Sequence, residues 1–259
     1  MTMAIPILAY SNHFENASSV SASSEATGYP KENAYDWRAY TYWKPTSGTS
    51  HQLDLDYGSA VSADCVALAF HNLDTLGATV TVHGSTDNFS ASDVTVHTVT
   101  LNGDAVCFET FTTTSYRYWR INISLGAAGQ PYIGAAFIGA KYALPHGLRI
   151  GYQSIYDNKQ DVIVNNIGQN GNFIGRTLIK QGIQGEIKFE FMTATEMRGN
   201  YRTFIDHART KPFFFNWNPG TYDADSMFLW LQPKGIRAPH ATQSLPYYEA
   251  TVMVEGVTQ

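Results

Sequence analysis

The stretch that decides the fold is Leu53-Asp-Leu-Asp-Tyr-Gly58, in which apolar and acidic residues alternate up to a glycine. Side chains of a β-strand point to opposite faces in turn, so this alternation predicts a strand with one buried and one solvated face. Short runs of the same kind recur roughly every ten residues through the first half, for example at 79–83 and 94–99, without a helical pattern between them. The first half is therefore predicted to be an all-β sandwich.

The composition is that of a folded, weakly charged chain of one or two domains. Of its 259 residues, 44% are hydrophobic and 15% are charged, and the net charge is −5. No basic stripe is present, so nucleic-acid binding is not expected. The N-terminus lacks a basic start and its apolar run is interrupted by Pro6, which makes it a poor signal peptide. No segment approaches the ~18 apolar residues of a membrane span. We expect synthesis in a cytoplasm and no membrane insertion.

Residues that could carry chemistry do not form a catalytic pattern. Cys65 and Cys107 lie in apolar surroundings, which suits two buried thiols, with a disulfide as the alternative. The eight histidines lack the spacing of a zinc site, and no nucleophile elbow or phosphate-binding loop occurs. Asp54 and Asp56 share the face predicted to be solvated. The sequence predicts a protein that is not an enzyme and has no metal site or cofactor.

Six short motifs follow one another along the first half. They are Asn33-Ala-Tyr-Asp36, Trp43, Leu53-Asp-Leu-Asp-Tyr-Gly58, Gly84-Ser-Thr-Asp87, Arg117-Tyr-Trp-Arg-Ile121 and Ile133-Gly-Ala-Ala-Phe-Ile-Gly139. In this order they resemble the discoidin family of coagulation factor 5/8 type C, or galactose-binding-like, modules over residues 5–143. The resemblance implies a jelly-roll β-sandwich over residues 1–144 that binds sugars or surfaces and seldom catalyses a reaction. One position departs from it, because Trp37 stands where the family has a glycine, at the loop of its common calcium site. Calcium thus stays open as a cofactor.

Aromatic and polar residues gather around the same loop, where Tyr40 and Tyr42 accompany two tryptophans. Sugar rings stack on aromatic faces while polar groups bind the hydroxyls, which is the usual pattern of a ligand site. Trp43 is assigned to the core, and the alternative for the tyrosines is that they cover the sheet edge. The candidate glycan site consists of Asp36, Trp37, Arg38, Tyr40, His71 and Asn72.

The second half, residues 145–259, has a different pattern. Asn170-Gly171 lies between apolar runs and favours a type I′ hairpin turn. Thr193 and Glu196 form a capping-box pattern and predict one helix over 194–209. The second half is therefore predicted to contain strands and a single helix.

Phe204-Ile205, Lys211 and the run Phe213-Phe-Phe215 have the spacing of a helix that precedes a strand. Over residues 145–257 this resembles the tail-tube-like fold of bacteriophage tail and distal-tail, or baseplate-ring, proteins. The resemblance implies a β-sandwich with one helix at its side and a homo-oligomeric ring, a hexamer in that family. It also implies contacts with tail tube, hub and fibre proteins.

The run that ends at Trp217 is too apolar for a strand exposed to water. Alternate residues of a strand face opposite sides, so the chain either buries both faces or uses one against a neighbouring subunit. Phe213, Phe215 and Trp217 share one face and are the candidate oligomer interface.

Two functions follow from these patterns. The main prediction is a structural virion protein of a phage tail tip or baseplate, made in the host cytoplasm. Its ring would join the tail tube to the adhesion apparatus, and its outer domain would bind host-surface glycans or serve architecture alone. The alternative is a carbohydrate-binding accessory module of a secreted polysaccharide-processing system, and a depolymerase is a weaker third hypothesis.

Overall fold

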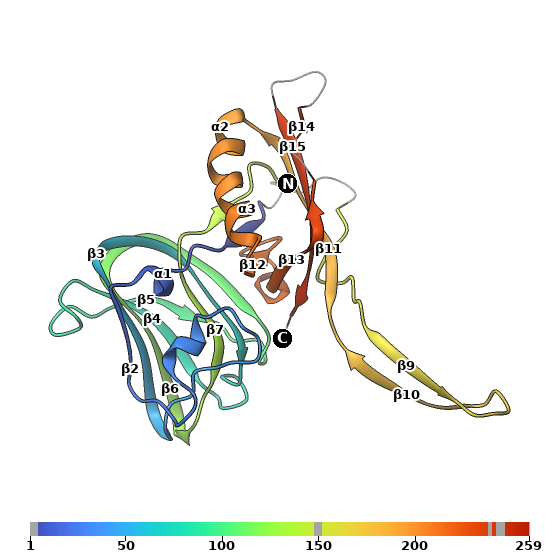
Figure 1. The fold of residues 1–259 in the computed structure, drawn as a ribbon. Helices are drawn as coiled ribbons and strands as arrows, with labels where there is room; N and C mark the ends of the chain where they lie inside the picture. The colour runs from blue at the N-terminus through green and yellow to red at the C-terminus, as the bar shows by residue number, and fades with distance from the viewer. Residues whose placement is uncertain (1–4, 148–151, 238–239, 242–246, 259) are drawn as a thin grey trace.

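The computed structural model describes residues 5–147, 152–237, 240–241 and 247–258, and Figure 1 shows how their elements are arranged. Strands account for 52% of the chain and helices for 11%, which confirms the predicted, mainly β fold class. Within the described residues the strands form a first sheet, a second sheet and a separate two-stranded hairpin.

The first sheet has the strand order β2-β3-β6-β4-β5, and β7 pairs with the end of β3. Its strands are β2 (Ser19–Ala22), β3 (Gly48–His71), β4 (Thr79–Ser85), β5 (Val94–Val99), β6 (Cys107–Gly129) and β7 (Ile133–Gly139). Figure 1 shows that the long strands β3 and β6 curve and fold the sheet over its own core. Leu53 and Leu55 lie in this core, 0% and 1% exposed, as the alternation predicts.

The second sheet has the order β11-β15-β13-β12-β1-β8, with β14 beside β15. Its strands are β1 (Ile7–Ala9), β8 (Tyr142–Ala143), β11 (Ile183–Met192), β12 (Phe213–Asn216), β13 (Met227–Ile236), β14 (His240–Ala241) and β15 (Tyr248–Val257). Because β1 and β8 come from the first half of the sequence, the predicted division into residues 1–144 and 145–259 does not follow the sheets. The apolar run of β1 is buried along its whole length between β12 and β8, so this segment of the first half belongs to the second sheet.

One helical segment packs on the second sheet, in the stretch for which the sequence predicts a helix. It consists of α2 (Ala194–Glu196), the π-helical turn η2 (Met197–Tyr201) and α3 (Arg202–Ala208). Its capping box forms, since Thr193 N donates to Glu196 Oε2 at 2.9 Å and Glu196 N donates to Thr193 Oγ1 at 3.2 Å. Phe204 is fully buried, and its ring lies 4.9 Å from that of Phe213. The remaining helices are short: α1 (His13–Asn16), η1 (Lys31–Ala34) and η3 (Asp223–Asp225).

The two sheets share an apolar core, which we call the shared core. Its buried residues are Ile7, Ala9, Trp37, Cys65, Ala67, Ala69, Val106, Phe108, Ala135, Phe137, Phe214 and Phe228. They come from β1, β3, β6, β7, β12 and β13, from the loop that contains Trp37 and, in the case of Val106, from the residue before β6. The first sheet is therefore packed directly against the second.

The aromatic run of β12 buries both of its faces inside the chain. Phe214 packs in the shared core, whereas Phe213 and Phe215 pack in the core beneath the helix. The prediction that Phe213 and Phe215 form an oligomer interface is wrong, because they are 0% and 1% exposed. Trp217 is half-buried and donates from Nε1 to Asp225 Oδ2 at 2.9 Å. The first of the two alternatives for this run is the correct one.

The hairpin consists of β9 (Val162–Ile167) and β10 (Phe173–Lys180), and Figure 1 shows it projecting away from both sheets. Asn170-Gly171 lies in its turn, as predicted. The predicted type I′ geometry is not formed, because that turn needs a positive φ at both central residues and, of this pair, Gly171 alone has one, at +78°. No helix in the described part of the chain is both long enough and apolar enough to cross a membrane.

Both cysteines are free and buried, which confirms the interpretation as buried thiols. Burial raises the pKa of the Cys107 thiol to about 12, so it stays protonated at neutral pH.

Candidate functional site

Trp37 does not lie on the surface where the sequence analysis placed it. Its side chain is 7% exposed and belongs to the shared core, with its ring centroid 6.2 Å from Phe228 and 6.0 Å from Phe214. The prediction that Trp37 contacts a glycan is therefore wrong. Its φ is +63°, a left-handed conformation that residues with a side chain seldom adopt, at the position where the discoidin pattern has glycine. The apolar contacts of the ring hold the backbone in this conformation.

The carboxylate of Asp36, next to Trp37, makes its hydrogen bonds to residues of the same loop. Asp36 accepts from Thr41 Oγ1 at 2.8 Å and from Arg38 N at 2.9 Å, so its carboxylate closes the turn. Arg38 and Tyr40 are exposed, Tyr40 to 77%. These two side chains are the members of the predicted glycan site that are fully open to solvent.

His71 and Asn72 hold the end of β3. His71 is 2% exposed, and burial lowers the pKa of its imidazole. Asn72 is half-buried, and its Oδ1 accepts from Tyr132 N at 2.8 Å. His71 is therefore not available to a ligand, and Asn72 positions a neighbouring tyrosine.

That tyrosine belongs to a cluster of three partly exposed rings, which we call the tyrosine platform: Tyr29, Tyr42 and Tyr132. The rings of Tyr29 and Tyr42 are stacked, with centroids 4.8 Å apart and planes at 16°, and Tyr132 lies 5.0 Å from Tyr42. The side-chain hydrogen bond between Tyr42 and Tyr29 raises the pKa of the Tyr42 hydroxyl. Lys44 Nζ lies 5.7 Å from the centre of the Tyr29 ring. The platform thus combines adjacent aromatic faces with one cation.

Buried neighbours hold the platform in place. Trp43 and Ile133 exchange backbone hydrogen bonds of 2.9 and 3.0 Å, and both side chains are fully buried. Trp43 also donates from Nε1 to Ser24 O at 3.0 Å. Because successive side chains of an extended segment point to opposite sides, the residues before these two anchors, Tyr42 and Tyr132, face outward. Two core residues therefore fix the orientation of two platform rings.

The acidic residues of the first sheet are paired with arginines. Asp54 accepts two hydrogen bonds from Arg120, at 2.7 and 2.9 Å, and Asp56 accepts two from Arg117, both at 2.8 Å. The hydrogen bonds from Arg117 lower the pKa of Asp56. Both carboxylates thus lie on the solvated face, as predicted. No group of three His, Cys, Asp or Glu residues within the described ranges could hold a metal ion.

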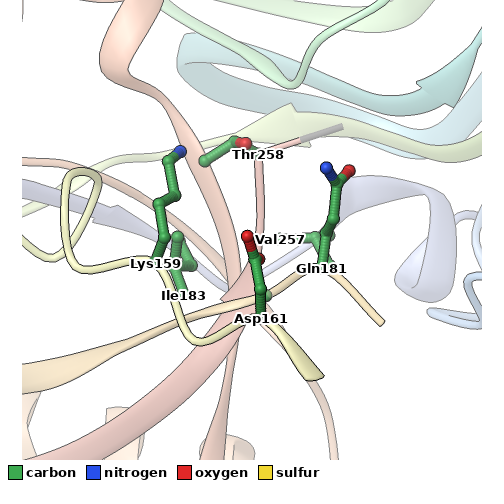
Figure 2. Close-up of a pocket in the computed structure, with 7 residues that line it drawn as sticks. Lys159, Asp161, Gln181, Ile183, Val257 and Thr258 are labelled. Carbon is green, nitrogen blue, oxygen red and sulfur yellow. The ribbon is translucent and has the colours of Figure 1, made fainter. Parts of the chain in front are cut away.

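A hollow of about 400 Å³ lies where the hairpin joins the second sheet (Figure 2). It is lined by Lys159, Asp161, Gln181, Gly182, Ile183, Val257 and Thr258. Figure 2 shows the side chains of Lys159, Asp161 and Gln181 rising on the same side of the backbone. The lining combines one carboxylate, Asp161, with the ammonium group of Lys159 and the hydroxyl of Thr258.

Sequence reasoning missed three members of this site: Tyr29, Lys44 and Tyr132. The signal for Tyr132 was its place before the apolar strand 133–139, which turns it outward if Ile133 is buried. Tyr29 and Lys44 had no comparable signal, because they meet the other rings only through the tertiary fold.

Comparison with known proteins finds structural likenesses that cover about half of the chain. No family model matches the chain, and no curated protein matches it. Chitosan-binding module 1 of a chitosanase/glucanase from Paenibacillus sp. IK-5 is 22% identical, with a TM-score of 0.41 over 49% of this chain and 97% of that one. The CBM32 of AlyQ, solved with 4,5-unsaturated mannuronic acid, is 26% identical, with a TM-score of 0.40 over 47% and 94%.

A third similar structure is CpGH89CBM32-5 from Clostridium perfringens, solved with GalNAc-beta-1,3-galactose. It is 13% identical, with a TM-score of 0.40 over 47% of this chain and 94% of that one. These neighbours are carbohydrate-binding modules. Their TM-scores lie below 0.5, so the function proposed for this chain rests on its own side chains.

Proposed function

We propose that this chain is a non-enzymatic protein that binds carbohydrate on the tyrosine platform. The observation that carries the proposal is the arrangement of three partly exposed rings within 5.0 Å of their neighbours, with an ammonium group at one end. The apolar face of a sugar ring stacks on such aromatic faces, and the phenol hydroxyls and Lys44 supply hydrogen bonds. Because Trp43 and Ile133 fix two of the rings, little conformational entropy is lost on binding. Carbohydrate binding is also what an accessory module of a polysaccharide-processing system would contribute.

Removing the central ring tests this proposal. We expect Tyr42→Ala to weaken sugar binding about fivefold, because a lost aromatic contact costs on the order of 1 kcal/mol and 1.4 kcal/mol is a factor of ten. Isothermal titration with chitosan and mannuronate oligosaccharides, after a glycan array, measures the change. Lys44→Met should weaken binding of the acidic sugar more than that of chitosan. Tyr40→Ala is the matched control, because Tyr40 is 77% exposed and outside the platform. Unchanged affinity in Tyr42→Ala and Tyr132→Ala would exclude the platform.

As a second function we propose a structural role in a phage tail, in which the second sheet forms a ring and the first sheet lies outside it. The specific observation is the shared core, in which Trp37 and Phe137 of the first half pack with Phe214 and Phe228 of the second. A sugar-binding domain fixed rigidly to an assembling one would present several weak sites in register, which gives strong attachment through avidity. The location in the virion and the partners, namely tube, hub and fibre proteins, are part of this proposal.

The oligomeric state of the purified full-length chain tests the second function. We expect closed rings of six copies by negative-stain microscopy and mass photometry. A strict monomer at high concentration would refute the ring, and would leave carbohydrate binding as the proposed function.

A further inference from the structure

The hairpin presents an unusually apolar surface for a segment that projects from the body (Figure 1). Eight of its large apolar side chains are between 41% and 72% exposed: Val162, Ile163, Val164, Ile167, Phe173, Ile174, Leu178 and Ile179. At roughly 100 Å² each they offer on the order of 800 Å², about what one partner contributes to a stable interface. Because alternate residues of a strand face opposite sides, this area is divided between the two faces of the hairpin, and each face offers about half of it, comparable to the largest apolar patch on a typical monomer at roughly 300–600 Å².

The strand register gathers part of this surface on one face. Ile163 is paired with Leu178, and Ile167 with Phe173, and both pairs lie on the same face as Arg176. Arg176 donates from Nε to Asn165 Oδ1 at 2.9 Å, between the two apolar pairs. A two-stranded sheet is marginally stable alone in water, so burial of this face against a partner would stabilise it.

We propose that the hairpin docks on a second copy of this chain. The charge distribution identifies the partner: residues 162–180 contain two basic residues, Arg176 and Lys180, and no acidic residue. Since the whole chain carries −5, the rest of it carries −7. A hairpin with positive charges is attracted to a partner of opposite net charge, and the rest of another copy, at −7, has that charge.

The same charges determine the symmetry of the contact. Two hairpins face to face would bring Arg176 of one copy towards Arg176 of the other, and like charges across an interface are unfavourable. Docking of a hairpin on the body of the next copy pairs opposite charges instead. Such a contact is heterologous, and it generates a closed ring or an open filament. This inference deepens the second proposed function and is independent of sugar binding.

Sedimentation velocity and mass photometry over a concentration series test whether the hairpin docks on a second copy. We expect the wild type to form oligomers, and Ile167→Thr/Phe173→Thr to need at least about tenfold higher protein concentration for half-assembly. Arg176→Glu should also weaken assembly, and added salt should weaken the wild type more than this variant. The matched control is Val94→Thr, an apolar residue 44% exposed on β5. Threonine favours strands, so the hairpin variants should keep the wild-type circular dichroism.

The possible outcomes separate the proposals. A wild type that is monomeric at every concentration, or hairpin variants that assemble like the wild type, would overturn the docking inference. Hairpin-dependent oligomers that do not close would uphold docking and refute the ring. Sugar titration on the same variants should give wild-type affinity, so failure of the tyrosine platform appears in a different measurement.

Discussion

Replacing Trp37 by alanine is expected to lower the free energy of unfolding by about 3–5 kcal/mol, the usual cost of deleting a large buried aromatic side chain. The indole packs against rings from both sheets, including Phe137, Phe214 and Phe228, so its removal leaves a cavity between them. Total stabilities are about 5–15 kcal/mol, and the variant should therefore be partly unfolded in mild denaturant. Urea denaturation followed by circular dichroism measures the effect.

Two further variants distinguish the loss of the indole contacts from the effect of the left-handed backbone conformation on stability. Trp37→Gly loses the same ring but relieves the left-handed conformation at φ +63°, so it should be about 1 kcal/mol more stable than Trp37→Ala. Tyr40→Ala, in the same loop and 77% exposed, should change stability by no more than about 0.5 kcal/mol. If Trp37→Ala unfolds like the wild type but loses sugar binding, the residue belongs to a ligand site after all.

Leu53 and Trp37 show when the burial of a side chain can be predicted from the sequence and when it cannot. The alternation around Leu53 fixes which side chains of one strand are buried, because that property is local to the strand. The burial of Trp37 depends on rings more than 170 residues away, in β12 and β13, and no pattern within its own loop encodes that contact. An aromatic residue beside polar ones in a loop has the same local sequence whether it meets a ligand or a second sheet.

The second sheet shows the same limit. The apolar run 213–217 correctly predicts that both faces of its strand are packed against other groups. It does not show whether those groups belong to the same chain or to a neighbouring subunit. The structure supplies them from the helix on one side and the first sheet on the other. β1 pairs with β12 through contacts such as Leu8 with Phe215, and such long-range pairing is not visible in either segment. The hairpin was predicted from its turn, whereas its isolation from both sheets is a tertiary property.

Of the polar residues where the chain passes from the second sheet to the first, Asn12 is expected to cost the most stability when it is replaced. It is 1% exposed, donates from Nδ2 to Ala136 O at 2.8 Å, and accepts at Oδ1 from Ile138 N and, as the N-cap of α1, from Phe14 N. Asn12→Ala removes a cap worth about 0.5–2 kcal/mol. It also leaves buried backbone groups of β7 without their partner, at about 1–3 kcal/mol. We expect a total loss of about 2–4 kcal/mol in urea denaturation.

Asn16→Ala is the matched control, because Asn16 is exposed and makes one weak hydrogen bond of 3.4 Å, to Asn12 O. Asn12→Asp gives a sharper test, since it keeps the acceptor oxygen for Phe14 N and Ile138 N and removes only the amide donor to Ala136 O. Burial next to a carbonyl should raise the pKa of the new carboxyl in the folded state above its unfolded value of about 3.9. The folded state then binds more protons, so the stability of this variant relative to wild type should fall as the pH rises through that range. A difference that does not change with pH would mean that the side-chain amide of Asn12 does not donate to β7.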